Sequence, residues 1–149
     1  MDHTVGHFFK ANMMYCLGFL NKYDRLDEHH GEFLIHGHEL CCLISSAPND
    51  FEEQQSYSLE ISYQVFDDYV VKPYAAAESV PKPFVREGDS LRYQLTGIFH
   101  GDRFSVGNLL FQDEALLQHF PSLEGHWITL TVDRLDVAIL SSPAGASYQ

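Results

Sequence analysis

The sequence predicts a mainly β fold (α+β at most), a single antiparallel barrel or sandwich with one N-terminal helix and one short helix near residues 113–120. Three observations favour this class. In Tyr57–Val65 every odd position is apolar or aromatic and every even position is polar, which is the period of a half-buried strand. Leu91–Leu95 alternates in the same way. Trp127–Leu140 alternates too but changes phase near Asp133, as a strand does where it bends between sheets.

The N-terminal region, residues 7–23, is expected to form the one long helix. Its apolar residues cover a wide arc at helical spacing, as in a helix that packs against a sheet. Thr4 is the expected N-cap. Gly18 argues against this helix, because glycine inside a helix costs about 1 kcal/mol relative to alanine. A polar connector, Asp24–Glu32, follows.

Two structures are consistent with the next apolar segment, Phe33–Ile44. It can form one strand, or it can form a hairpin in which Gly37 lies in a tight turn between two short strands. Ser45–Ser56 has the composition of a turn and loop, centred on Pro48-Asn49-Asp50.

The second half is expected to alternate strands, turns and one short helix. Three prolines in Lys72–Pro83 exclude a central strand there. Asp113–Phe120 is the expected short helix, capped by Asp113 and ended by Pro121. We expect one domain over residues 1–149, because a chain of 149 residues holds one sizeable core, with 1–6 and 141–149 as loose ends.

The order of elements in the second half resembles an oligonucleotide-binding-type barrel, in which a helix separates the third and fourth strands. The segments that carry the resemblance are strands at 91–99 and 104–111, the helix at 113–120 and the strand at 127–140. The resemblance concerns the pattern of elements and involves no family motif. The ligand it would imply is an oligonucleotide, which the acidic charge and the lack of a basic, aromatic strip disfavour.

The charge balance narrows the classes of partner. The chain has 21 acidic and 9 basic residues and a formal net charge of -12. Such a charge repels nucleic-acid phosphates and anionic membrane surfaces, whereas it accelerates encounter with a basic protein. We therefore expect a basic protein partner, no nucleic acid and no membrane. The charge is equally consistent with a role in solubility alone.

The cysteines and the N-terminus predict a cytoplasmic location. Cys16, Cys41 and Cys42 are odd in number and two are adjacent, so they do not form a disulfide framework and fit reduced thiols. The first ten residues contain no basic cluster before the apolar run, which argues against a signal peptide. No apolar run is long enough to span a bilayer.

The sequence predicts no cofactor and no catalytic set. His36 and His38 are the candidate metal ligands, because residues two apart on a strand point the same way and two imidazoles could share an ion. The alternative is a turn with exposed histidines. Cys42 could act as a nucleophile, but its apolar neighbours favour a buried, unreactive thiol.

Acidic residues gather on both sides of the Tyr57–Val65 strand, and we expect them to form the partner-binding surface with Tyr69 as an aromatic anchor. This predicts a non-enzymatic protein-binding module, in concrete form an inhibitor or immunity-type protein that neutralises a basic nuclease or toxin. The alternatives are a small-ligand or metal-dependent β-barrel enzyme that uses His36 and His38, and a structural subunit of a larger complex. The residues expected to bind the partner are Asp50, Glu52, Glu53, Asp67, Asp68 and Tyr69.

Overall fold

The computed structural model describes residues 10–13, 16–24, 29–75 and 81–140, the first of these ranges by its backbone alone. The expected loose ends, 1–6 and 141–149, lie outside the described residues. The fold is mainly β, with a closed five-stranded barrel and a second sheet, as the sequence predicts. The strands are β1 (Lys10–Met13), β2 (Cys16–Asp24), β3 (His30–Ile35), β4 (His38–Ser46), β5 (Gln55–Gln64), β6 (Val70–Pro73), β7 (Phe84–Arg86), β8 (Tyr93–His100), β9 (Arg103–Val106), β10 (Leu109–Gln112), β11 (Trp127–Val132) and β12 (Arg134–Ile139), and the helices are α2 (Glu114–His119) and the 3₁₀ helix η1 (Pro121–Leu123).

The barrel consists of β2, β3, β4, β5 and β12. Strands β2, β3 and β4 form an antiparallel meander, and β5 returns to pair with β2, which gives the Greek-key order. Strand β12 closes the ring, parallel to β4 and antiparallel to β5. A five-stranded Greek-key barrel is the oligonucleotide-binding type of arrangement. Most of the segments that carried the predicted resemblance are not barrel strands, however: the strands at 91–99 and 104–111 lie in the second sheet, and four of the five barrel strands come from the first half.

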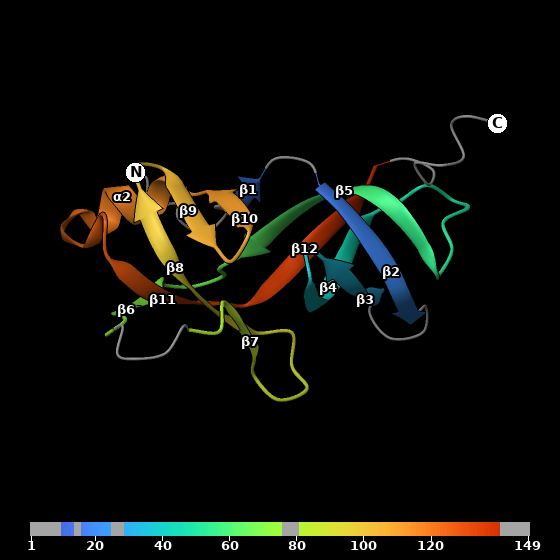
Figure 1. Ribbon diagram of the computed structural model, residues 1–149, viewed down its shortest axis with the longest axis horizontal. Coiled ribbons are helices and arrows are strands. Elements are labelled where there is room, and N and C mark those ends of the chain that lie inside the picture. Colours follow the sequence, from blue (N-terminus) through green and yellow to red (C-terminus); the bar gives the residue numbers. More distant parts are fainter. Residues whose placement is uncertain (1–9, 14–15, 25–28, 76–80, 141–149) are drawn as a thin grey trace.

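The second sheet comprises β1, β6, β7, β8, β9, β10 and β11. Its strands follow the order β1-β10-β9-β8-β11-β6. Strands β7 and β9 pair along the same edge of β8, β7 with the first residues of β8 and β9 with the last. Strand β5 connects the two parts, because β2 and then β1 pair along one of its edges while β12 pairs along the other. Figure 1 shows β2, β3 and β4 on one side of the molecule and β8–β11 on the other, with β5 and β12 running between them.

The phase change predicted near Asp133 is confirmed. Ile128, Leu130 and Val132 are buried in the second sheet, and beyond Asp133 the odd-numbered residues of β12 are buried in the barrel. The Asp133 N–H donates to the Gln64 carbonyl at 2.8 Å, and the Asp133 side chain accepts from the Phe66 N–H at 2.7 Å. These two bonds satisfy the backbone where the strand passes from one sheet to the other.

The predicted N-terminal helix over residues 7–23 was wrong: the described residues of that range lie in β1 and β2. In β2, Gly18 and Leu20 are buried, whereas Leu17 is 56% exposed, so the burial period is two. The exposed apolar residues on the outer face hid this alternation in the sequence. A Cβ on Gly18 would clash with Leu59 Cδ1, so a larger residue here requires the Leu59 side chain to shift where β2 pairs with β5. The expected N-cap, Thr4, lies outside the described residues.

Of the two structures considered for Phe33–Ile44, the hairpin is correct. Strands β3 and β4 pair from His30↔Leu43 to Ile35↔His38, which leaves His36 and Gly37 as a two-residue turn. Both turn residues have positive φ, 50° and 84°, as a type I′ hairpin turn requires. The connector predicted at Asp24–Glu32 was too long, because β3 already begins at His30.

The short helix is confirmed as α2. The Asp113 carboxylate caps it by accepting from the N–H groups of Ala115 at 2.9 Å and Leu116 at 3.3 Å. Among the described residues of Lys72–Pro83 there is no central strand: β6, which ends at Pro73, lies at the edge of the second sheet.

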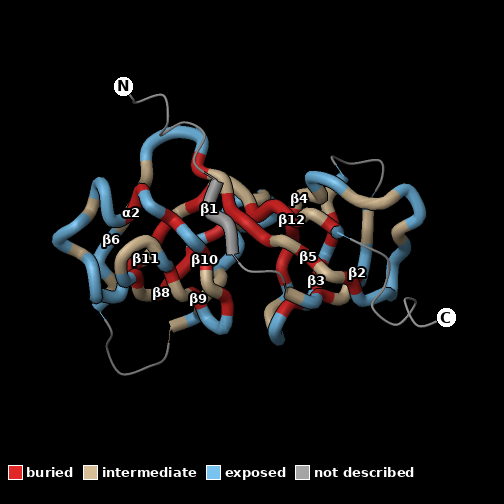
Figure 2. Tube along the Cα trace, turned by 90° about the horizontal axis from the view of Figure 1, so that it is seen from above, coloured by how far each residue is buried: buried red, intermediate tan, exposed pale blue. Residues whose placement is uncertain are grey.

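The core follows the alternation of β5. Tyr57, Leu59, Ile61 and Tyr63 are at most 1% exposed, whereas Glu60 and Gln64 are partly exposed. Figure 2 shows buried positions concentrated along the strands of both parts, with exposed positions at the outer loops. Within the described residues, no helix has the length and apolar character needed to cross a membrane.

Candidate partner-binding site

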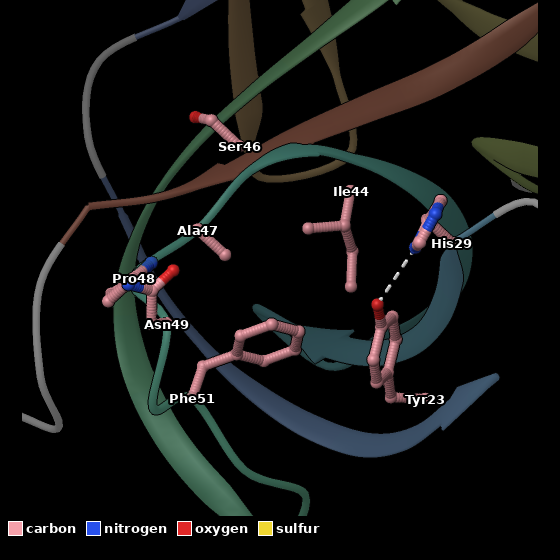
Figure 3. Close-up of a pocket in the computed structure, with 8 residues that line it drawn as sticks. All are labelled: Tyr23, His29, Ile44, Ser46, Ala47, Pro48, Asn49 and Phe51. Carbon is pink, nitrogen blue, oxygen red and sulfur yellow. Dashed lines mark hydrogen bonds between the residues drawn. The ribbon is translucent and has the colours of Figure 1, made fainter. Parts of the chain in front are cut away.

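A pocket of about 250 Å³ lies at one end of the barrel. The end of β2, the residue before β3, the end of β4 and the β4–β5 loop contribute to it (Figure 3). Chain segments that are distant in sequence meet here because β2 and β4 both end on this side of the barrel. The pocket is lined by Tyr23, His29, Ile44, Ser46, Ala47, Pro48, Asn49 and Phe51.

The aromatic residues of the pocket hold one another in place. The rings of Tyr23 and Phe51 lie 4.7 Å apart with an interplanar angle of 63°, an edge-to-face contact that aromatic pairs favour. The Tyr23 hydroxyl lies 3.0 Å from Nδ1 of His29, and Figure 3 shows this bond at one side of the group of lining residues. The rings of Tyr23 and Phe51 also pack against the barrel core, so their positions are set by the fold.

The β4–β5 loop is fixed by bonds to its neighbours. The Glu52 N–H donates to the Tyr57 hydroxyl at 2.7 Å, and that hydroxyl donates back to the Glu52 carbonyl at 3.2 Å. The Glu53 carboxylate accepts from the Tyr23 N–H at 2.8 Å. The Gln54 N–H donates to the Leu20 carbonyl at 2.6 Å. These hydrogen bonds fix the backbone of the loop, and they therefore fix the positions from which its side chains project.

Three predicted site residues, Asp50, Glu52 and Glu53, are exposed on this loop and flank the pocket. The barrel as a whole is acidic: the basic residues it contains within the described ranges are Lys22 and Arg134, and Arg134 is paired with Asp136 at 2.7 Å. Its described acidic residues are Asp24, Glu32, Glu39, Asp50, Glu52, Glu53, Glu60 and Asp136. The described basic residues of the second part are Lys10, Lys72, Lys82, Arg86, Arg92 and Arg103.

The other predicted site residues, Asp67, Asp68 and Tyr69, follow the opposite end of β5. Ten residues of β5 separate the two clusters, a length of about 30 Å in an extended strand. Asp67 and Asp68 are exposed, whereas Tyr69 is half-buried and its hydroxyl donates to Asp113 at 3.0 Å. The structure thus brings Asp50, Glu52 and Glu53 to the pocket but does not bring the second cluster there.

Asp113, Tyr63 and Tyr69 form a buried network that sequence reasoning missed. Both tyrosine hydroxyls donate to the Asp113 carboxylate, which also accepts from the N–H groups of Ala115 and Leu116 in the first turn of α2. Burial raises the pKa of Asp113, and the hydrogen bonds from Tyr63 and Tyr69 act in the opposite direction. Burial followed by the nearby Asp113 charge raises the pKa of both tyrosines. The network ties β5 and the segment before β6 to the start of α2.

The metal candidates His36 and His38 lie at different places in the hairpin. His36 is exposed in the turn, and His38 begins β4 with its ring 4.9 Å from the Phe84 ring. Burial, and secondarily His36, lowers the pKa of His38. Among the described residues there is no group of three or more His, Cys, Asp or Glu side chains that could hold a metal ion.

All three cysteines are free. Cys42 is fully buried in the barrel core, and burial raises its thiol pKa well above the ordinary value, which makes it a poor nucleophile. Cys41 is 5% exposed and faces away from the barrel interior, and burial raises its pKa as well.

The pocket itself was not predicted. Tyr23 was assigned to the end of a helix, and His29 to a polar connector. Phe51 was the available signal: a single aromatic residue in an otherwise polar, acidic loop, between Asp50 and Glu52. An aromatic side chain in such a loop usually packs against another ring or an apolar side chain, and here Phe51 packs against Tyr23.

Comparison with known proteins places residues 13–140 within one family. No curated protein and no solved structure matches the chain significantly. The family model covers both the barrel and the second sheet, from the end of β1 to the residue after β12. The chain belongs to the family described as Uncharacterised conserved protein UCP019853.

Proposed function

We propose that this protein is a non-enzymatic, acidic protein-binding module of the inhibitor or immunity type, which neutralises a basic partner such as a nuclease or toxin. The observation that carries the proposal is the acidic rim around a preformed pocket at the barrel end. A rigid rim costs little ordering entropy on binding, because its loop is already held by hydrogen bonds from Tyr57 and to Leu20.

The charge distribution supports a basic partner. The described part of the barrel carries many carboxylates and few cations, so its potential attracts a positively charged surface and accelerates encounter. The same potential repels nucleic-acid phosphates. In oligonucleotide-binding-type barrels the face of strands two and three takes the nucleic acid. Here that face is partly covered by the chain itself, because Cys41 on β4 is 5% exposed and its N–H donates to Tyr93 of the second sheet at 2.8 Å.

The two acidic clusters have different roles in the proposed interface. Asp50, Glu52 and Glu53 lie on the loop that contributes Asn49 and Phe51 to the pocket, and they form the proposed centre of the interface. Asp67 and Asp68 lie about 30 Å along β5. An interface of standard size, about 800 Å² per partner, is roughly 30 Å across, so an interface centred on the pocket extends only about 15 Å from it and does not reach the second cluster. Three free cysteines fit a reducing compartment, which supports a cytoplasmic location.

The test is capture of the partner from the native host, followed by binding kinetics across a salt series. We expect a basic protein whose association rate falls about tenfold or more from low to physiological salt. Asp50→Asn with Glu52→Gln should slow association more than the matched change Asp67→Asn with Asp68→Asn. Truncating Tyr69 should act mainly on dissociation if the second cluster takes part. A strongly acidic partner, or an association rate that does not change with salt, would refute the proposal.

A further inference from the structure

We propose that the pocket at the barrel end accepts one arginine side chain of the partner, an inference that rests on the proposed function and names the group that would enter. The occupant must fit three features of the pocket: apolar and aromatic side chains within a lining that is otherwise polar, hydrogen-bond acceptors among the lining residues, and carboxylates on the adjacent loop. Arginine combines an apolar stem with a planar cationic head, so it matches all three.

The walls suit the stem. Ile44, Ala47 and Pro48 line the pocket and are partly buried, and Phe51 adds the aromatic face opposite them (Figure 3). A guanidinium group stacks favourably on an aromatic ring, and the interaction strengthens where water is displaced. The edge-to-face contact with Tyr23 holds the Phe51 ring in one orientation, so the stacking surface is formed before the ligand arrives.

The polar lining and rim suit the head. A guanidinium has five N–H donors and no acceptor. Ser46 and Asn49 line the pocket and each carries a side-chain oxygen that can accept, while Asp50 is exposed next in the chain. The eight lining residues include no Lys or Arg that would repel a cation. A lysine head would gain the same charge attraction but neither the planar stacking nor the fork of donors.

The inference can be tested with blocked peptides and the full chain, monitored by backbone amide NMR. The probe is acetyl-Gly-Arg-Gly-amide, with citrulline as the neutral isostere and lysine as the second cation. We expect saturable shifts at Ala47 and Asn49 with a Kd of about 1 mM, and binding of the citrulline peptide at least about tenfold weaker. The lysine peptide should lie between them.

Two variants and one control connect the binding to the pocket. Phe51→Leu keeps an apolar side chain but removes the ring, and Asp50→Asn removes the nearest rim charge; each should weaken the arginine peptide several-fold. Asp89→Asn makes the same charge change in the exposed β7–β8 turn and should leave binding unchanged. Undisturbed shifts of the remaining amides would establish that each variant is folded.

The outcomes separate this inference from the proposed function. Absence of shifts at the pocket residues, or equal binding of the citrulline and arginine peptides, overturns the arginine pocket. A basic partner captured through Asp50 and Glu52 would then still support the proposed function. Conversely, arginine binding in the pocket together with capture of an acidic partner would refute the function and leave the arginine pocket standing.

Discussion

At the scale of single residues, Tyr93 fixes the contact between the barrel and the second sheet. Strand β12 pairs with β4 only from Leu43 onward, so the Cys41 N–H has no strand partner on that side, and the Tyr93 hydroxyl accepts its hydrogen bond at 2.8 Å. Burial raises the pKa of Tyr93 to about 12, so the hydroxyl stays protonated at neutral pH.

We expect Tyr93→Phe to lower the free energy of unfolding by about 1–3 kcal/mol, because the Cys41 N–H is then buried without an acceptor. Tyr74→Phe, which makes the same change on a partly exposed residue after β6, should alter it by less than about 0.5 kcal/mol. Urea unfolding of both variants gives the comparison. Equal effects would mean that the hydroxyl of Tyr93 contributes nothing specific.

His38 should make stability depend on pH. Its Nε2 is buried, without a hydrogen-bond partner among the described residues, beside Gly107, Pro83 and the Phe84 ring. Burial lowers its pKa in the folded state, so the unfolded chain binds this proton more tightly. The stability that the folded state gains from holding His38 neutral is therefore fully present above about pH 6.5. It is lost as the pH falls through the lowered pKa that His38 has in the folded state.

We expect the unfolding free energy of the unmodified protein to fall across this pH window more steeply than that of His38→Gln. His119→Gln is the control, because His119 is exposed in α2 and does not contribute to the lowered pKa of His38. Urea titrations between about pH 7 and 5 measure the slopes. Parallel pH profiles for the unmodified protein and His38→Gln would show that burial of this imidazole has no consequence for folding.

At the scale of elements, Gly18 distinguishes strand from helix at the N-terminus. In a helix, Gly18→Ala would stabilise by up to about 1 kcal/mol. In β2 the added Cβ would lie 2.3 Å from Leu59 Cδ1 and 3.0 Å from Ile35 Cγ1, so we expect destabilisation by about 1–3 kcal/mol. Leu17→Ala, on the exposed face of the same strand, should have a much smaller effect. Thermal or urea unfolding shows whether Gly18→Ala stabilises the protein, as in a helix, or destabilises it, as in β2.

The sequence pattern correctly predicted the elements that bury one face and expose the other. Strand β5, the phase change at Asp133 and the capped helix α2 each follow a local rule, either alternation or a capping side chain. Strand β2 failed because its outer face also carries apolar residues, such as Leu17, so local pattern could not separate period two from 3.6. The pocket could not be predicted at all, since it depends on the end of β2 and the β4–β5 loop meeting across the barrel.

At the scale of the whole molecule, the two parts are joined by β5 and by the bent strand formed by β11 and β12. β5 pairs with β2 and β12 in the barrel and with β1 of the second sheet, while β11 and β12 are two halves of one bent strand. Separating the parts would leave residues 62–64 of β5 without their β1 partner and would cut the bent strand between β11 and β12, and unpaired backbone in a buried strand is costly. The architecture therefore predicts one cooperative unit, in line with the single domain expected from the chain length.

This cooperativity can be measured with Trp127, the one tryptophan of the chain, which lies on β11 in the second sheet. Leu59→Ala removes a fully buried side chain from the barrel and should cost about 2–5 kcal/mol, whereas Glu60→Ala, partly exposed beside it, should cost about 0.5 kcal/mol or less. If folding is cooperative, Leu59→Ala shifts the unfolding transition seen by Trp127 fluorescence by the same free energy as that seen by far-UV circular dichroism. A Trp127 transition that keeps its midpoint while the circular dichroism transition moves would establish two independently folding parts, with the shared strands too weakly coupled to transmit the loss.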